Sequence, residues 1–320
     1  MHAPSPHGPA ASAASAAPGR CRAGRRAAHA ALAPRAVLAL LTVLAAAAPA
    51  HAQRLLDWPL RANAGPDAFQ PGAAAVFWNP ALLPAHPGRA DADLLDMSGP
   101  DEIGIDGFGL ATAARVIDGL DVGLAYQRTS IGDMTRTDGP PLPLPEPEFE
   151  VAEDVLSAAV ARRIVPGLDG GASLRWIRPN EQAGGDSEWE GALGLAGRHT
   201  IGPVRARAAL ALTIADFARW AAAVEAGPRP GLLPVDASVA LGLAERRLDT
   251  VAWQPVARVV FRHALEVIAG AAGEPGANGR TWEPVLGVTL RLERWTVGLV
   301  REELPNGFGG AMHYRLGITF

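Results

Sequence analysis

The chain ends in AMHYRLGITF (Ala311–Phe320), in which apolar and polar side chains alternate. Successive side chains of an extended strand point to opposite faces, so this stretch has one apolar face and one hydrophilic face. The apolar face consists of Met312, Tyr314, Leu316, Ile318 and Phe320. Such a strand fits either a half-buried sheet of a soluble protein or a barrel wall that separates lipid from a polar lumen.

The same alternation recurs along the chain. In VRARAALALTI (Val204–Ile214) and VLGVTLRLE (Val285–Glu293) the charged side chains share one face, and the other face is apolar. A charged face cannot pack into the core of a soluble β-sandwich, because burying charges without partners is strongly unfavourable. The pattern therefore favours a membrane barrel, and an exported soluble all-β protein is the alternative.

Counting these segments from about Asp91 onward gives the expected number of strands. About twelve or thirteen segments alternate in this way, and the stretch Thr250–Ala272 could hold one long strand or two. Bacterial single-chain barrels have even strand numbers. We therefore predict an all-β fold, a transmembrane antiparallel β-barrel of about 12–14 strands with a short N-terminal plug segment.

The expected connections alternate in length. Short ones contain pairs such as Pro166–Gly167 and Glu293–Arg294. The longer ones are expected at Thr135–Glu150, Arg178–Ser187, Ala218–Pro234 and Glu274–Arg280. Short turns at one rim and long polar loops at the other are typical of outer-membrane barrels.

Residues 1–52 have the composition of an export signal. They contain arginines but no Asp or Glu, then the apolar run Ala36–Ala48, and a small-x-small pattern that ends at Ala52. This order predicts a signal peptide cleaved after Ala52, followed by a plug segment at 53–88 and a barrel at 89–320. The single cysteine, Cys21, lies within the signal, so we expect no disulfide and no thiolate metal ligand. The formal net charge of −4 makes nucleic acid an unsuitable partner.

The C-terminal strand resembles the β-signal of bacterial outer-membrane proteins, which ends in an aromatic residue preceded by apolar residues at every second position. The residues that carry this resemblance are Tyr314, Leu316, Ile318 and Phe320. The resemblance implies that the barrel assembly machinery recognises this strand. Physically, we expect it to pair with the first strand and close the barrel, which removes an exposed apolar edge.

A second stretch, GPDAFQPGAAAVFWNPALLPAHPG (Gly65–Gly88), lies between the signal and the first strand. It predicts a short helix over Ala73–Trp78 that stops before Pro80, with Asn79 outside helical geometry. It is similar to the N-terminal segment of the FadL family, which transports long-chain fatty acids and other hydrophobic molecules, and equally to the PorV/PorQ family of type IX secretion. The matching residues are Ala75, Phe77, Asn79, Pro80, Ala81 and Leu82.

The resemblance implies a plug inside the lumen, with Phe77, Asn79 and Pro80 at its gate. Non-helical backbone at membrane depth is tolerated where protein or water surrounds it. The alternative is a periplasmic tether that only orders the N-terminus. The C-terminal third resembles the PorV-like pattern. Where that pattern has its usual motif, before the last residues of the final strand, this chain has Met312, His313 and Tyr314, and only His313 matches.

Several charged side chains are expected to face the lumen, because they fall on the polar face of their strands. These candidates are Arg175, Glu190, Arg205, Arg207, Glu283, Arg291, His313 and Arg315. One interpretation is an electrostatic network that fills a narrow barrel. The other is an arginine wall that binds the carboxylate of a fatty acid.

The remaining motifs point away from catalysis. The sequence after the signal has no Gly-x-Ser-x-Gly, no His-Glu-x-x-His and no phosphate loop, so we predict no enzyme, no cofactor and no metal. The leading functional hypothesis is passive uptake or binding of a small hydrophobic molecule across the outer membrane. The alternative is a scaffold barrel that binds a secretion-system protein, which the Pro-rich stretch Asp138–Glu150 favours slightly as a docking surface. Outer-membrane lipid and the barrel assembly machinery are the other expected partners.

Overall fold

The computed structural model describes residues 60–85, 90–100, 104–134, 149–180, 186–214, 218–229, 235–247, 250–276, 279–303 and 309–320. All of them belong to one unit of the chain, Pro49–Phe320. The predicted signal peptide and its cleavage site lie outside the described residues. The three predicted segment boundaries stay predictions.

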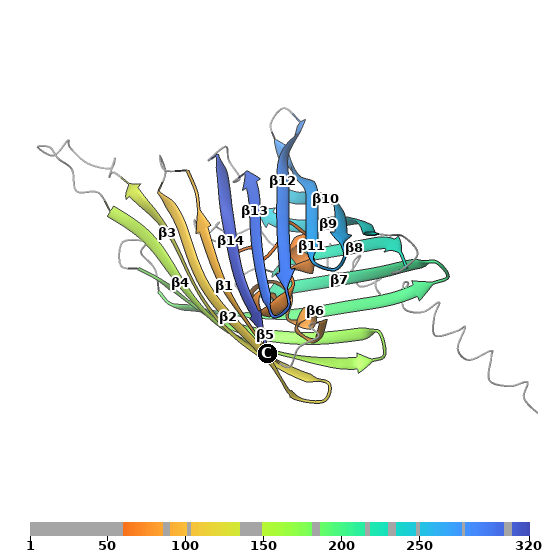
Figure 1. Ribbon diagram of the computed structural model, residues 1–320. Helices are drawn as coiled ribbons and strands as arrows, with labels where there is room; N and C mark the ends of the chain where they lie inside the picture. The colour runs from red at the N-terminus through yellow and green to blue at the C-terminus, as the bar shows by residue number, and fades with distance from the viewer. Residues whose placement is uncertain are drawn as a thin grey trace, which may run out of the picture. The chain divides into compact units, whose positions relative to one another are not determined.

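In the described part of the chain, fourteen antiparallel strands close into a barrel in which each strand pairs with its neighbours in sequence (Figure 1). The strands are β1 (Ala90–Ser98), β2 (Ile105–Ile117), β3 (Leu120–Met134), β4 (Phe149–Val165), β5 (Leu168–Pro179), β6 (Glu188–Ile201), β7 (Val204–Ile214), β8 (Ala218–Pro228), β9 (Val235–Arg247), β10 (Thr250–Phe261), β11 (Leu265–Gly276), β12 (Gly279–Leu292), β13 (Trp295–Glu303) and β14 (Gly310–Thr319). The predicted fold class is confirmed.

Two details of the strand assignment are settled by the structure. The ambiguous stretch Thr250–Ala272 holds two strands, β10 and β11. The prediction of long loops at Ala218–Pro234 and Glu274–Arg280 was wrong, because strand β8 occupies Ala218–Pro228 and only 277–278 separate β11 from β12. Alanine is small enough for either face of a barrel, so the alanine-rich β8 has no visible alternation.

The last strand closes the barrel, as expected. β14 pairs with β1 through partners that include Leu94 with Leu316 and Asp91 with Thr319. The backbone N–H of Phe320 also donates to the carbonyl of Ala90 at 2.9 Å. Closure leaves neither strand as an open edge that could pair with another chain.

The two faces of the wall differ in their environment. Large apolar side chains point outward and are exposed, such as Leu124 at 61% and Leu286 at 53%. Their inward-pointing neighbours, such as Gln127 and Thr289, are buried. An exposed apolar outer band around a polar interior is the arrangement that a barrel presents to lipid. Among the described residues, no helix is long and apolar enough to cross a membrane.

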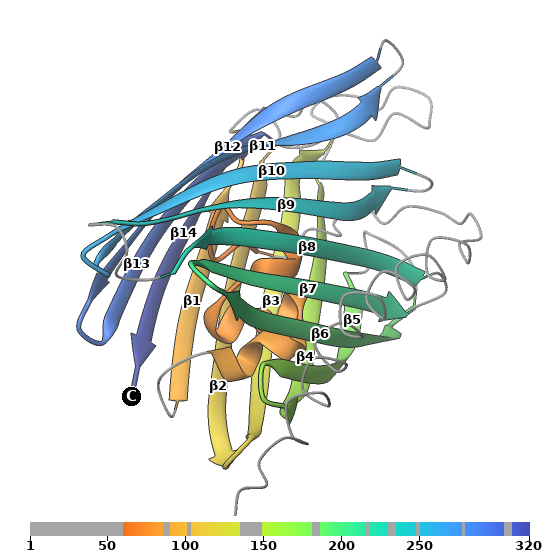
Figure 2. The ribbon, with the colours of Figure 1, turned by 90° about the vertical axis from the view of Figure 1, so that its right-hand side faces the viewer.

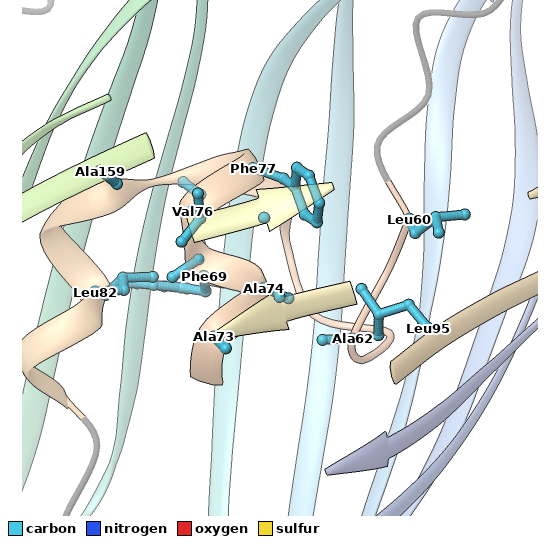
Figure 3. Close-up of a cluster of buried hydrophobic side chains, with 14 of the residues drawn as sticks. Leu60, Ala62, Phe69, Ala73, Ala74, Val76, Phe77, Leu82, Leu95 and Ala159 are labelled. Carbon is cyan, nitrogen blue, oxygen red and sulfur yellow. The ribbon is translucent and has the colours of Figure 1, made fainter. Parts of the chain in front are cut away.

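The interior contains residues Leu60–Ala85, which we call the inner segment (Figure 2). It consists of 3₁₀ turns η1 (Asp67–Phe69), η2 (Gly72–Ala74) and η3 (Pro80–Ala85) and the single-turn helix α2 (Ala75–Trp78). Its apolar side chains, Phe77 and Val76 among them, are buried in one cluster with Leu95 and Ala159 of the wall (Figure 3).

Helix α2 ends where the sequence predicts. Asn79 precedes a proline and has φ −148° and ψ 97°, which is extended backbone. The N–H of Asn79 still donates to the carbonyl of Ala75 at 2.9 Å, and η3 starts at the next residue. The Asn-Pro pair therefore forms a sharp break between two short helical pieces inside the barrel.

Candidate functional site

The inner segment is bonded to the wall through its own backbone. Polar side chains that point inward from three strands accept hydrogen bonds from backbone N–H groups of this segment, which would otherwise be buried without partners. The bonds run from Leu60 to Oε1 of Gln127 (3.0 Å), from Asp67 to Oε1 of Gln254 (3.0 Å) and from Ala74 to Oδ2 of Asp93 (3.3 Å).

Arg61 is the main ionic contact at the start of the inner segment. Its guanidinium lies 2.6 Å from a carboxylate oxygen of Asp67 and 2.6 Å from one of Glu302 on β13. It also lies over the ring of Trp78, 5.4 Å from the centroid. Glu302 in turn lies 2.9 Å from Nε2 of the buried His313. Arg61 thus connects η1, α2 and the wall through charge-assisted contacts.

Asp93 and Arg315 form a second connection. Nε of Arg315 on β14 donates to Oδ1 of Asp93 on β1 at 2.8 Å, and both side chains are buried. Because Asp93 also accepts from the backbone of Ala74, this ion pair across the closing seam binds the inner segment as well. Gly72 lies against the same pair, in left-handed backbone with φ 73°. A side chain at this position would be strained and would collide with the ion pair.

Arg175 forms a third connection, next to the gate residues. Its guanidinium donates to the carbonyl of Phe77, the residue before the last position of α2. It also lies 3.7 Å from Glu190 on the neighbouring strand, which pairs with Arg219 at 3.2 Å. Arg175 and Glu190 are both buried. The arginine therefore satisfies a carbonyl at the C-terminal end of the helix, where a positive charge is favourable.

The side-chain amides of Gln70 and Asn79 form hydrogen bonds within the inner segment. Gln70 makes four bonds: Oε1 accepts from the N–H groups of Ala62 and Asn63, and Nε2 donates to the carbonyls of Asn63 and Gly65, all within 3.1 Å. Asn79 donates through Nδ2 to the carbonyl of Ala68 at 3.2 Å. Neither amide has a measurable exposed surface. Fully satisfied buried amides of this kind favour one conformation of the segment.

Glycines of the wall face the inner segment at several places. A Cβ on Gly171 would lie 2.6 Å from backbone atoms of Pro80 and Ala81, and a Cβ on Gly194 would collide with Oδ1 of Asn79. The other wall glycines that leave no room for a Cβ because of the inner segment are Gly107, Gly109, Gly123, Gly242 and Gly287. The wall and the segment are therefore shaped to each other, and the Asn-Pro break lies directly on β5 and β6.

A further ionic network lines the other side of the barrel. Glu266 on β11 pairs with Arg258 at 2.6 Å and with Arg291 at 3.0 Å. Glu225 on β8 pairs with Arg207, whose guanidinium lies over the ring of Phe69, 4.4 Å from its centroid. These contacts join several strands to η1 and pair three arginines with two carboxylates.

The sequence-predicted site residues can now be placed. Arg175, Glu190, His313 and Arg315 are buried within the contacts above, whereas Arg205 and Glu283 are half-buried on their strands. Phe77, Asn79 and Pro80 are buried where the inner segment meets β5 and β6. Of the residues expected to form the assembly signal, Tyr314, Leu316 and Phe320 are exposed on the outside. The functional roles of these residues stay predictions.

Sequence reasoning missed several residues that hold the inner segment. Arg61 and Gln70 lie in a stretch without periodicity, so nothing in the sequence marks them. Asp93 lies on β1, whose inward residues are Asp91, Asp93, Leu95 and Met97. Because two of these four are apolar, the sequence shows no clear alternation of polar and apolar residues there. Among the described residues, no group of three potential ligands could hold a metal ion.

These features define the class of the protein as a closed fourteen-stranded β-barrel with an apolar outer face and an inner segment. No protein-family model matches the chain, and no curated protein matches it. Among solved structures it is similar to the toluene transporter TbuX of Ralstonia pickettii, at 13% identity and a TM-score of 0.52, over 78% of this chain and 94% of that chain.

Two further solved structures are similar to the chain. The toluene transporter TodX of Pseudomonas putida has 12% identity and a TM-score of 0.48, over 83% of this chain and 96% of that one. The outer membrane protein Omp33 of Acinetobacter baumannii has 9% identity and a TM-score of 0.48, over 73% and 98%. At such identities the likeness to TbuX shows the fold alone, and the predicted FadL-type barrel is confirmed as a fold.

Proposed function

We propose that the protein resides in the outer membrane and takes up or binds small hydrophobic molecules, with the inner segment as its plug. One observation carries this proposal: a buried apolar helix with an Asn-Pro break is held inside a lipid-facing barrel by contacts to its inward side chains. The shared fold with a toluene transporter supports the same class of substrate.

In the proposed mechanism the substrate is captured at the long-loop rim and moves along apolar side chains of the plug. Phe77 and Leu60 are buried apolar side chains of this segment and are the proposed surface. The Asn79–Pro80 break is the point at which α2 and η3 change their relative position. Arg61 and Asp93 anchor the part of the segment before the break, so the movement concerns the part after it.

Uptake of radiolabelled toluene and oleate into cells that produce the protein tests this proposal. Deleting 65–83 removes most of the plug and is expected to increase the leak of small sugars from proteoliposomes. The matched control is Asp118→Asn in an exposed turn outside the lumen. No uptake of either probe above the level of empty cells would overturn the proposed substrate class, and an unchanged sugar leak would overturn the plug.

The proposed capture of a fatty acid carboxylate needs a free inward arginine. Arg207 already pairs with Glu225, whereas Arg205 lies further toward the short-turn rim. We therefore expect Arg205→Gln to weaken oleate binding more than Arg207→Gln does. Unchanged oleate affinity after both substitutions together would eliminate the carboxylate hypothesis.

The competing functions differ in what supports them. Most of the Pro-rich stretch that favours a secretion scaffold, 138–148, lies outside the described residues, so the scaffold remains a hypothesis based on resemblance. The exported soluble protein conflicts with the exposed apolar outer surface. Co-purification of a stoichiometric protein partner with an empty lumen would favour the scaffold.

A further inference from the structure

The outer wall has an apolar groove across three neighbouring strands, β3, β4 and β5. Its volume is about 540 Å³. On the lipid side Ala158 stands between its register partners Leu124 and Leu174, which are both exposed and form the walls. One row closer to the short turns, Ala172 stands beside Val160. The groove exists because the small side chains of Ala158 and Ala172 stand between larger ones on these three strands.

Arg162 stands one outward position beyond the groove, toward the short turns. Arg162 follows Val160 on the outward face of β4, and its register partner on β5 is Gly170, which has no side chain. Ile164, the next outward residue, lies across Gly170: a Cβ there would be 2.7 Å from its Cδ1. The exposed apolar residues Val160 and Ile164 therefore flank Arg162 along β4, close to where the membrane surface is expected.

Arg162 has no counter-ion within the described part of the chain. In the described part of the chain its neighbour Arg163 pairs with Asp169 at 3.3 Å, whereas no carboxylate pairs with Arg162. An arginine on the lipid face of a barrel is unfavourable unless its charge reaches the interface or an anion. The anion available beside an apolar groove in a membrane is a lipid phosphate.

We propose that this groove binds one anionic phospholipid of the leaflet at the short-turn rim. One acyl chain lies between Leu124 and Leu174 over Ala158, and the phosphate accepts hydrogen bonds from the guanidinium of Arg162. An arginine binds a phosphate through two parallel N–H groups, which gives such a site both affinity and orientation. Anionic headgroups bind better than zwitterionic ones, whose own cation competes for the phosphate.

Native mass spectrometry of the full chain in mild detergent, titrated with dioleoyl-phosphatidylglycerol or dioleoyl-phosphatidylcholine, tests this site. We expect one saturable phosphatidylglycerol and weaker binding of phosphatidylcholine. Arg162→Gln should weaken the binding of this lipid at least about tenfold, as expected for loss of charged hydrogen bonds. Ala158→Leu fills the groove and should have a similar effect. If the Ala158→Leu variant fails to fold, Ala172→Leu is used in its place, because Ala172 lines the same groove.

Two matched controls show whether the effect is local. Arg294→Gln removes an exposed arginine from another turn of the same rim, and Ala269→Leu enlarges an exposed alanine on β11. Both should bind phosphatidylglycerol like the unaltered protein. The proposal is overturned if that protein shows no saturable site, if Arg294→Gln weakens binding as much as Arg162→Gln, or if neither groove variant changes it.

Discussion

Replacing Gly171 by alanine is expected to displace the inner segment at its Asn-Pro break. The added Cβ would lie 2.6 Å from the carbonyl carbon of Pro80 and from the backbone nitrogen of Ala81. Ordinary contact begins at 3.4 Å, so strand and segment must separate by about 0.8 Å. Both colliding atoms belong to backbone, so no side-chain rotation can relieve the contact.

The energetic effect can be estimated from the cost of overpacking. An extra methyl group in a well-packed interior costs typically about 1–3 kcal/mol. If this cost applies only to the conformation in which the inner segment packs against β5, the conformation in which it has moved away becomes about 5- to 150-fold more populated. Hydrogen–deuterium exchange of the peptide that contains Leu82, whose N–H donates to the carbonyl of Asn79, should accelerate by this factor. The leak of small sugars from proteoliposomes should increase in parallel.

Gly197→Ala is the matched control. It makes the same substitution on the adjacent strand β6, but the nearest atom to its Cβ is 3.9 Å away. It should leave both exchange and leak unchanged. If Gly171→Ala exchanged no faster than Gly197→Ala, the close contact between β5 and the backbone of Pro80 and Ala81 would be refuted. Faster exchange without any leak would instead show that the break does not gate the lumen.

Three other substitutions test the contacts and the terminus. Arg61→Gln removes the guanidinium that pairs with the carboxylates of Asp67 and Glu302 and should cost up to about 3–5 kcal/mol, measured as faster exchange of the inner segment. Adding Glu302→Gln should restore part of this loss, and additive losses would contradict the pairing. Glu266→Gln removes the carboxylate that pairs with Arg258 and Arg291 and, among the described residues, leaves Arg258 with only the longer contact to Glu225 at 3.7 Å. The melting temperature of the barrel in detergent should therefore fall, and an unchanged value would show that the network contributes little. Phe320→Ala removes a side chain that is 66% exposed, so refolding in detergent should be unaffected while assembly in cells falls; an equal loss in both assays would indicate a structural role instead.

The membrane barrel could be predicted from the sequence because a barrel wall imposes a period of two on every strand. Where large apolar residues alternate with charged ones, as in Val285–Glu293, the direction of each side chain follows directly. The prediction failed at Ala218–Pro228, where alanine suits both faces and carries no information on direction. Asn79 was placed correctly outside the helix, since proline restricts the residue that precedes it.

The amino-acid sequence by itself determined the barrel class, the inward or outward direction of most strand residues, and the break before Pro80. These are local properties, because they depend on alternation and on backbone sterics within a few residues. Only the tertiary structure decided which residues meet inside the barrel. Arg61 contacts Glu302 across more than two hundred residues of sequence, and Gly171 leaves room for Pro80 because closure brings β5 against the inner segment. Such contacts depend on strand register and barrel closure, which no local pattern encodes.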